Sequence, residues 1–599
     1  MSLQEILTLA VTLLTVLLLV RGRIRPDLVA LIALLILGLS RITSPEQTLA
    51  GFSSSAVITI LAISIMAEGL HQSGISYQLG QIMKRLAGND EKRLVITVTL
   101  SGALLSLFMN NIAAISVLLP ATMSLSRQTG KPPSRLLMPL AFGVLAGGMA
   151  TLFTTSNIIT SGLLKESGFR PFGILDFLPI GIPIVILTTL FMGYLGYKLL
   201  PSLNPSGQAK QSHLKREEIL RVYGIDAALW EVVISHGSGM AGLSIKEGAW
   251  FTRTGLSVIG ITRNGTFITS PGPEMQLKEG DVLLTHGNPE NENLEYFGIK
   301  LNEKITRIRE IHDVSTSLTE ITLVPHSNFA TKTLREIHFR EKYNLTVLAL
   351  WRSGKPIHAN FTDIPLQVGD GLLVSGLTEN LQMLDQDRDF IILEEDPDAI
   401  AHPQKRNLAA WIGLVTLGLA VTGWVPIALV SLLGAVMMLL FGCLNMDEAT
   451  KSLDWKVIFL IAGLWPLSTA ITSSGLSSLL VQPFLSISNQ TNSLFLVSAI
   501  IFITMVLTNI MAGQAATPLI IAPIGLAIAK ATGLDPRMIM MAIAMGCSLA
   551  FITPLGHPVN LIVMSSGGYT YRDFIKVGLQ LTFLIFILIL IGLNLLWIH

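Results

Sequence analysis

Long apolar runs occupy both ends of this chain, and a charged, turn-rich stretch separates them. Residues 94–126, 136–164 and 457–529 contain no ionisable side chain. Runs of this length and character are typical of segments that lie in a lipid bilayer. They predict helices at about 5–21, 27–43, 55–73, 135–153 and 177–200, and again at about 408–424, 427–442, 456–472, 537–552 and 573–597.

Two runs, 94–126 and about 494–530, are too long for one ordinary span. Each carries a polar cluster near its middle, Met109–Asn111 in the first and Thr508–Ile510 in the second. We therefore expect two helical hairpins, each entering and leaving the membrane on one side, with these clusters at their tips.

The helix that follows each hairpin is interrupted as well, at 154–157 in the first half and at 553–560 in the second. A broken helix in hydrocarbon leaves backbone groups without partners, each at a cost of several kcal/mol. Such breaks persist where they are buried in protein or line a cavity. There the half-helix ends offer amides to an anion and carbonyls to a cation.

The two halves form an internal repeat. Three anchors keep spacings of 10 and 27 residues in both copies: Pro120, Gly130 and Asn157 in the first, and Pro523, Gly533 and Asn560 in the second. The upstream Asn111 and Asn509 also match, although the second copy has five more residues before its proline.

Basic residues predict the orientation. If the N-terminus is outside, one side collects Arg21, Arg23, Arg25, Lys84, Arg85, Lys92, Arg93, Arg127, Lys131, Arg135, Arg572 and Lys576. The loop expected at 473–493 faces the other side and carries no charge. This asymmetry follows the positive-inside rule, and it makes the two hairpins enter from opposite sides. The fold class is therefore an α-helical polytopic membrane protein of two inverted repeats, 1–203 and 405–599, in the cell (inner or plasma) membrane, with both termini outside. Inverted repeats are typical of secondary transporters.

The stretch 204–404 is too long for a loop, and we expect it to be cytoplasmic. Gly255–Gly265 resembles Asn344–Gly354, and Leu277–Gly287 resembles Leu366–Gly376, both at an offset of 89 residues. Alternating β-branched positions and Gly-Asp turns predict two similar α+β modules, 204–300 and 301–404.

Composition and motifs argue against several classes of function. The 599 residues are 50% hydrophobic and 14% charged, with a net charge of +1. A nucleic-acid partner is not indicated. The sequence shows neither a nucleophile–base pair nor a set of metal ligands, so we expect no enzyme and no organic cofactor. Cys443 and Cys547 read as small core residues.

At the tips Asn110-Asn111-Ile112 and Thr508-Asn509-Ile510, and at the bends 154–157 and 557–560, the chain resembles the divalent anion:sodium symporter family of the ion-transporter superfamily. That resemblance covers about 400 residues. It implies sodium near Asn111 and Phe153 and near Asn509 and Gly556, a homodimer, and alternating access of the elevator type. The substrate-lining residues that it implies are Asn110, Asn111, Thr154, Thr155, Ser156, Asn157, Thr508, Asn509, His557, Pro558 and Asn560.

Two departures bear on the cargo. Both tips lack the third-position Thr that helps carboxylate carriers bind their substrate, and His557 stands where the family has a Thr. The insert resembles paired C-terminal modules of the regulator-of-potassium-conductance type (TrkA-C), which are often found in sulfate-type members. The resemblance thus points to sulfate or a related oxyanion. A dicarboxylate symporter, an arsenite or cation/proton carrier on the same fold, and a ligand-gated channel or sensor subunit remain as alternatives.

Each hypothesis about a site residue has an alternative in which the residue has only a structural role. Asn111 and Asn509 are also suited to capping hairpin helices, although their repeat-related placement favours binding, and Asn157 and Asn560 are suited to joining the broken backbone. His557 either donates to an oxyanion or simply bonds a nearby carbonyl. The modules either bind a small anionic ligand or only pack and dimerise. A proton antiporter usually carries an Asp or Glu at its broken elements, and none stands here.

Overall fold

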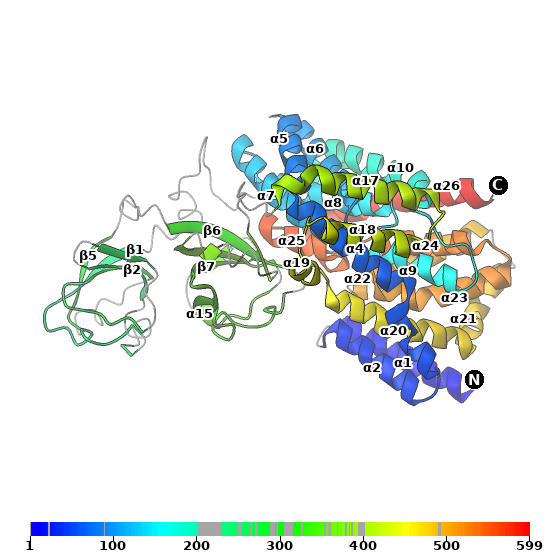
Figure 1. Cartoon of the computed structure of the whole chain (residues 1–599), viewed down its shortest axis with the longest axis horizontal. Coiled ribbons are helices and arrows are strands. Elements are labelled where there is room, and N and C mark those ends of the chain that lie inside the picture. The colour runs from blue at the N-terminus through cyan, green and yellow to red at the C-terminus, as the bar shows by residue number, and fades with distance from the viewer. Residues whose placement is uncertain are drawn as a thin grey trace.

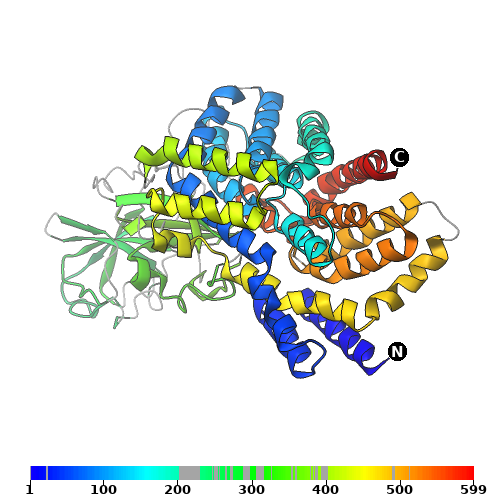
Figure 2. The same ribbon diagram turned by 45° about the vertical axis from the view of Figure 1, so that its right-hand side comes forward.

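In the computed structural model, the repeats form one helical bundle, and the insert forms two β modules at one end of it (Figure 1). Both termini lie at the end of the bundle away from the modules (Figures 1 and 2). The structure describes residues 2–598 except 22–23, 89, 202–228, 246, 249–253, 255, 264–265, 270–273, 288–293, 295–296, 305–315, 325–326, 353–354, 358–360, 368, 378–379, 382–383, 385–386, 388, 393–401, 489–492 and 512.

The two repeats contain the same ten elements in the same order. The first has α1 (Leu3–Arg21), α2 (Pro26–Leu39), α3 (Pro45–Leu49), α4 (Ser55–Gln72), α5 (Ile75–Ala87), α6 (Glu91–Ser106), α7 (Asn111–Thr129), α8 (Leu137–Met149), α9 (Thr155–Glu166) and α10 (Leu178–Phe191), which a short α11 (Tyr197–Leu199) extends. The second has α17 (Arg406–Thr422), α18 (Ile427–Leu440), α19 (Met446–Lys451), α20 (Trp455–Ser473), α21 (Leu476–Ser488), α22 (Ser493–Met511), α23 (Ala516–Thr532), α24 (Pro536–Ser548), α25 (Pro558–Gly567) and α26 (Tyr571–Leu593).

Six segments of the described chain are long and apolar enough to cross a membrane: Leu3–Arg21, Pro45–Gln72, Ile174–Leu199, Trp455–Ser473, Ser493–Met511 and Tyr571–Trp597. Their outward side chains are apolar and exposed, as lipid-facing positions are. Both repeat prolines lie inside helices, Pro120 in α7 and Pro523 in α23. Both repeat glycines adopt a positive φ just after those helices, 65° at Gly130 and 73° at Gly533, where a left-handed residue ends a helix.

The repeats are inverted and interlocked. Helix α4 ends beside the insert, where the His402 amide donates to the Gln72 carbonyl at 3.0 Å. Its counterpart α20 ends at the N-terminal end of the bundle, where a Cβ added to Gly475 would lie 3.3 Å from the Glu5 carboxylate. Each repeat also packs against the other, α2 against α20 and α18 against α4.

The two hairpins enter from opposite ends, as the sequence predicts. The base of α6–α7 lies at the insert end, because Lys131 is 3.5 Å from Glu91 and the Ser134 hydroxyl donates to the Pro201 carbonyl at 2.8 Å. The base of α22–α23 lies at the far end, where Arg537 forms a 2.5 Å ion pair with Asp176 at the start of α10.

Two local predictions were wrong. The segment expected to be a loop at 473–493 contains α21, the counterpart of α5. Its apolar residues recur at helical spacing among serines, which masked the pattern. Residues 508–510 lie in the last turn of α22 instead of at the hairpin tip, since α22 is three residues longer than α6. Asn509 therefore ends the first limb of its hairpin, whereas Asn111 begins the second limb of the other.

The insert contains two antiparallel sheets of the same strand order. The first is β3-β2-β4-β1-β5, formed by β1 (Leu229–Ile234), β2 (Leu256–Arg263), β3 (Thr266–Thr269), β4 (Val282–Gly287) and β5 (Ile299–Lys304). The second is β8-β7-β9-β6-β10, formed by β6 (Thr316–Leu323), β7 (Thr346–Arg352), β8 (Lys355–Ile357), β9 (Gly371–Leu377) and β10 (Phe390–Ile392), with the helix α15 (Phe339–Tyr343). The predicted boundary between the modules, at residue 300, lies within strand β5, which pairs with β1 of the first sheet.

The repeat within the insert extends to its side chains. Arg263 forms an ion pair with Asp281 at 2.6 Å, and Arg352 with Asp370 at 2.5 Å, again 89 residues apart. Both carboxylates are almost fully buried and also accept a backbone N–H, from Lys278 or Gln367. Each pair joins the end of one strand, β2 or β7, to the turn before β4 or β9.

Candidate functional site

Four helices begin at the middle of the bundle: α7 at Asn111, α9 at Thr155, α23 at Ala516 and α25 at Pro558. Each follows a hairpin tip or a break, and α7 contacts α25 while α9 contacts α23. Helix N-termini carry unpaired N–H groups and partial positive charge, so this arrangement favours an anion without a buried Arg or Lys.

The first hairpin tip meets the second break at Asn111. Its Oδ1 accepts from the Ser106 hydroxyl at 2.7 Å, and its Nδ2 lies 3.3 Å from Nε2 of His557. A Cβ at Gly148 would stand 2.4 Å from the same Oδ1, so α8 approaches this close only because residue 148 has no side chain. Asn110 does not reach across: its Oδ1 accepts the Ala113 amide at 2.8 Å and caps α7.

The second hairpin meets the same break through Asn509. Its Nδ2 donates to the Leu549 carbonyl at 2.9 Å, and its Oδ1 accepts from the Thr553 hydroxyl at 3.3 Å. A Cβ at Gly556 would lie 2.7 Å from that Oδ1. The structure therefore brings Asn111 and Asn509 together around Gly556 and His557, although they occupy different limbs of their hairpins.

Asn157 and Asn560 join the broken backbones. The Asn157 amide donates to the Thr151 carbonyl at 2.6 Å, and the Asn560 amide donates to the Ala550 and Thr553 carbonyls at 2.7 and 3.2 Å. Both side chains are fully buried. Among the described atoms, Asn560 Oδ1 has no hydrogen-bond partner, which leaves one acceptor oxygen at the second break.

The remaining predicted residues divide into two groups. Thr154 precedes α9, is buried, and has no partner for its hydroxyl among the described residues. Thr155 and Pro558 begin their helices, and Phe153 is half-buried in the first break. The other two hydroxyls are engaged structurally. Thr508 donates to the Thr504 carbonyl within α22, and Ser156 lies 3.3 Å from the Ser548 hydroxyl of α24.

His557 presents one ring nitrogen to the site. Its Nδ1 accepts the Val559 amide at 3.1 Å, so the proton of the neutral ring belongs on Nε2, the atom that faces Asn111. The ring is 5% exposed. The named side chains of this cluster are amides, hydroxyls and one imidazole, which suit both an oxyanion and a cation with oxygen ligands.

Sequence reasoning missed three contributors, Ser106, Gly148 and Thr553, which position the two hairpin asparagines. Thr553 stood inside the predicted break, and Gly148 in a Gly-Gly pair, so both carried a weak signal. Ser106 is one of many serines on apolar helices, and only the fold identifies it.

Comparison with known proteins gives a consistent result. Residues 16–522 match the citrate transporter family (CitMHS). An uncharacterized transporter of Escherichia coli (strain K12), YfbS, is 30% identical over 94% of this chain and 94% of its own length. Sodium/sulfate cotransporter 1 of Chlamydomonas reinhardtii is 20% identical over 96% of this chain and 88% of its own length. The RCK_C domain dimer of S. agalactiae BusR, solved in complex with c-di-AMP, is 31% identical and covers 12% of this chain and 88% of that chain, with a TM-score of 0.11.

Proposed function

This chain belongs to the citrate transporter family, and on that premise we propose that it is a secondary-active symporter that couples Na⁺ to the movement of a small divalent oxyanion, with sulfate as the cargo. The family lies in the same ion-transporter superfamily as the divalent anion:sodium symporters, which confirms the resemblance seen in the sequence. The protein is thus a multi-pass membrane transporter.

One observation carries the anion assignment. Asn111 Nδ2 and His557 Nε2 are both N–H donors, and they lie 3.3 Å apart. A single oxyanion oxygen can accept from both. The N-termini of α7, which begins at Asn111, and of α25, which begins just after His557, add their partial positive charge. Because the donors are neutral, they can bind a divalent anion without holding it as tightly as a buried ion pair would.

Na⁺ coupling is supported by oxygen atoms at the same elements. Asn509 Oδ1, Asn560 Oδ1 and the Thr154 hydroxyl lie at the two breaks, where the carbonyl ends of α8 and α24 also stop. In broken-helix transporters such carbonyl ends coordinate Na⁺. We propose sodium sites near Asn111 and Phe153 and near Asn509 and Gly556. Relatives such as sodium/sulfate cotransporter 1 are named for this coupling.

Alternating access would move the hairpins and broken helices as one unit against a scaffold. The scaffold comprises α2–α4 and α18–α20, which pack across the repeats. We propose that the scaffold, within residues 27–73 and 408–472, also forms the interface of a homodimer. Trp411 and Trp424, on and just after the neighbouring α17, are exposed in the single chain.

Uptake into proteoliposomes tests the proposed function. We expect radiolabelled sulfate to enter when an inward Na⁺ gradient is present, and not when K⁺ replaces Na⁺ on both sides. Unlabelled molybdate should compete, whereas arsenite should not. The family match makes citrate the second candidate cargo, so citrate and succinate uptake are measured in the same vesicles. If folded protein carries citrate but no sulfate, the proposed cargo is wrong and citrate takes its place. Uptake that is independent of Na⁺ would refute the proposed coupling.

A further inference from the structure

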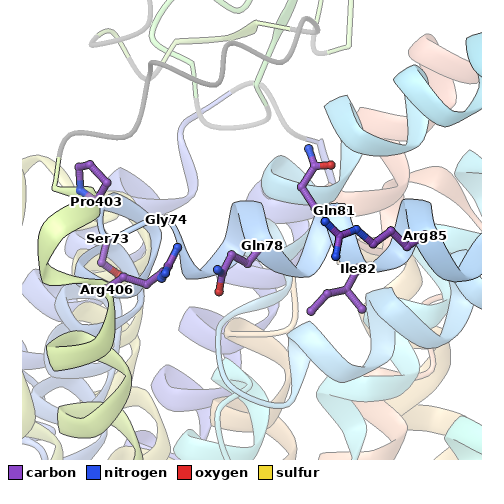
Figure 3. Close-up of a pocket in the computed structure, with 8 residues that line it drawn as sticks. All are labelled: Ser73, Gly74, Gln78, Gln81, Ile82, Arg85, Pro403 and Arg406. Carbon is purple, nitrogen blue, oxygen red and sulfur yellow. The ribbon is translucent and has the colours of Figure 1, made fainter.

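A pocket lined by two arginines and two glutamines lies at the insert end of the bundle, far from the two breaks in sequence. Its volume is about 440 Å³. It lies between the end of α4, one face of α5 and the start of α17, just where the chain returns from the insert (Figure 3). The lining residues are Ser73, Gly74, Gln78, Gln81, Ile82, Arg85, Pro403 and Arg406.

The pocket is positively charged. Arg85 and Arg406 stand at opposite ends of it, with Gln78 and Gln81 between them (Figure 3). None of the lining residues is acidic. Within the described part of the chain, neither arginine forms a hydrogen bond or ion pair that would neutralise it. Two guanidinium groups left without a carboxylate beside amide donors are suited to a phosphate, which they bind with paired N–H groups.

Backbone groups reinforce that charge. Helix α5 begins after Gly74, which has a φ of 80° and gives no side-chain cap. Helix α17 begins after Lys405, again without a side-chain cap. The amides of the first turn of α5 are thus not capped by a side chain, and such amides favour an anion, whereas the Arg406 amide at the start of α17 donates to the Pro403 carbonyl.

The surroundings are apolar on one side. Ile82 and Leu86 of α5 are exposed, 48% and 55%, beside Arg85. A helix with exposed apolar residues next to a basic one, at the end of a membrane bundle, lies at the level of the lipid headgroups. A ligand in this pocket can therefore rest its apolar part on α5 while its anionic part reaches the arginines.

We propose that this pocket binds an anionic ligand that carries a phosphate group, with Arg85 and Arg406 at its two ends. Its position gives that phosphate a second consequence. Helix α5 leads directly into the first hairpin and contacts α7, whereas Arg406 is the first residue of α17 after the insert. A ligand bound here connects the start of α17, where the chain returns from the insert, to α5, which leads into the hairpin. The phosphate comes either from the headgroup of an anionic phospholipid or from a soluble phosphate compound.

Binding to the purified full-length protein distinguishes the two sources. Native mass spectrometry counts retained phosphatidylglycerol against phosphatidylcholine, and a thermal-unfolding assay follows added inorganic phosphate at constant ionic strength. The variants are Arg85→Gln, Arg406→Gln and their combination. The matched control is Arg572→Gln with Lys576→Gln, which removes two charges from α26 near the same end, outside the pocket. Asn111→Ala changes the transport site, so it distinguishes phosphate bound at that site from phosphate bound in the pocket.

We expect wild-type protein, Asn111→Ala and the control to retain the phosphate ligand, and the double variant to bind it at least about tenfold more weakly, as loss of charge-assisted hydrogen bonds predicts. Retention of phosphatidylglycerol alone assigns the pocket to a lipid, and stabilisation by inorganic phosphate assigns it to a soluble ligand. Equal losses in the control and the pocket variants, or no phosphate binding by wild-type protein, would overturn the proposal. The single variants give the same answer if the double variant does not fold.

Discussion

At the scale of the residue, His557 connects parts of the chain that are 446 residues apart. Its ring accepts the Val559 amide on one side, and its Nε2 faces Asn111 Nδ2 at 3.3 Å on the other. The sequence pointed to His557 because it is the one histidine in the long apolar run 538–571. It could not show that Ser106 orients Asn111, because a hydrogen bond between two limbs of a hairpin depends on the exact turn at its tip.

Substitutions of His557 separate a donor from a proton carrier. His557→Ala should raise the KM for sulfate roughly tenfold or more, since a hydrogen bond to a charged group contributes about 1.5–3 kcal/mol. His557→Gln places an amide nitrogen close to the Nε2 position and should restore most of the affinity. Uptake kinetics over pH ~6–8 should stay level in the wild type if the ring acts as a neutral donor. A steep pH dependence that disappears in His557→Gln would favour a proton-coupled carrier instead.

At the scale of the element, close helix contacts depend on glycine. A Cβ at Gly143 would lie 2.0 Å from the Thr99 carbonyl oxygen, and one at Gly147 would lie 2.2 Å from that of Ala103. Helix α8 thus lies directly on the backbone of α6, which fixes the first limb of the hairpin beside the first break. Small residues permit such contacts between membrane helices, where lipid supplies little hydrophobic drive for association.

Gly147→Ala should push α6 and α8 apart. Overpacking of this kind costs about 1–3 kcal/mol, so we expect a lower yield of monodisperse protein and a lower apparent Tm in detergent. Gly418→Ala in α17 is the matched control, because its Cβ would meet nothing within 4 Å. A Gly147→Ala protein as stable as Gly418→Ala would show that the two helices can separate without cost.

Most element boundaries could be predicted from the sequence within a few residues, because apolar runs and their ends are local features. The expected helix 456–472, for example, is Trp455–Ser473. Helix α21 escaped notice because serines interrupt its apolar residues, which masks their helical spacing. The place of Asn509 was misjudged for a different reason: five extra residues could be added to either limb of the hairpin or to its tip, and spacing alone does not say which.

At the scale of the whole molecule, the inverted repeat gives the bundle two distinct ends. The insert and the base of the first hairpin lie at one end, and both termini lie at the other (Figure 1). We propose that the insert end faces the cytoplasm, as the clustering of basic residues indicates. The native Cys443 and Cys547 are buried, so added thiols can report which end is accessible.

Labelling of intact cells with a membrane-impermeant maleimide tests this orientation. Ser2→Cys, near the N-terminus, should react without permeabilisation. Lys332→Cys, at an exposed position of the second module, should react only after the membrane is opened. The unsubstituted protein measures the background from the native cysteines. The reverse labelling pattern would show that the molecule has the opposite orientation, with the insert outside the cell.

The interlocking of α2 with α20 also constrains when the molecule can assemble. Roughly 430 residues separate the starts of these two helices, and at about 5–20 residues per second a ribosome needs roughly 20–90 s to cover them. During that time α20 has not been made, so it cannot yet cover the face of α2 where Gly463 packs against Ala30. The two β modules of the insert are translated within this interval, so they can complete their folding before the bundle closes beside them.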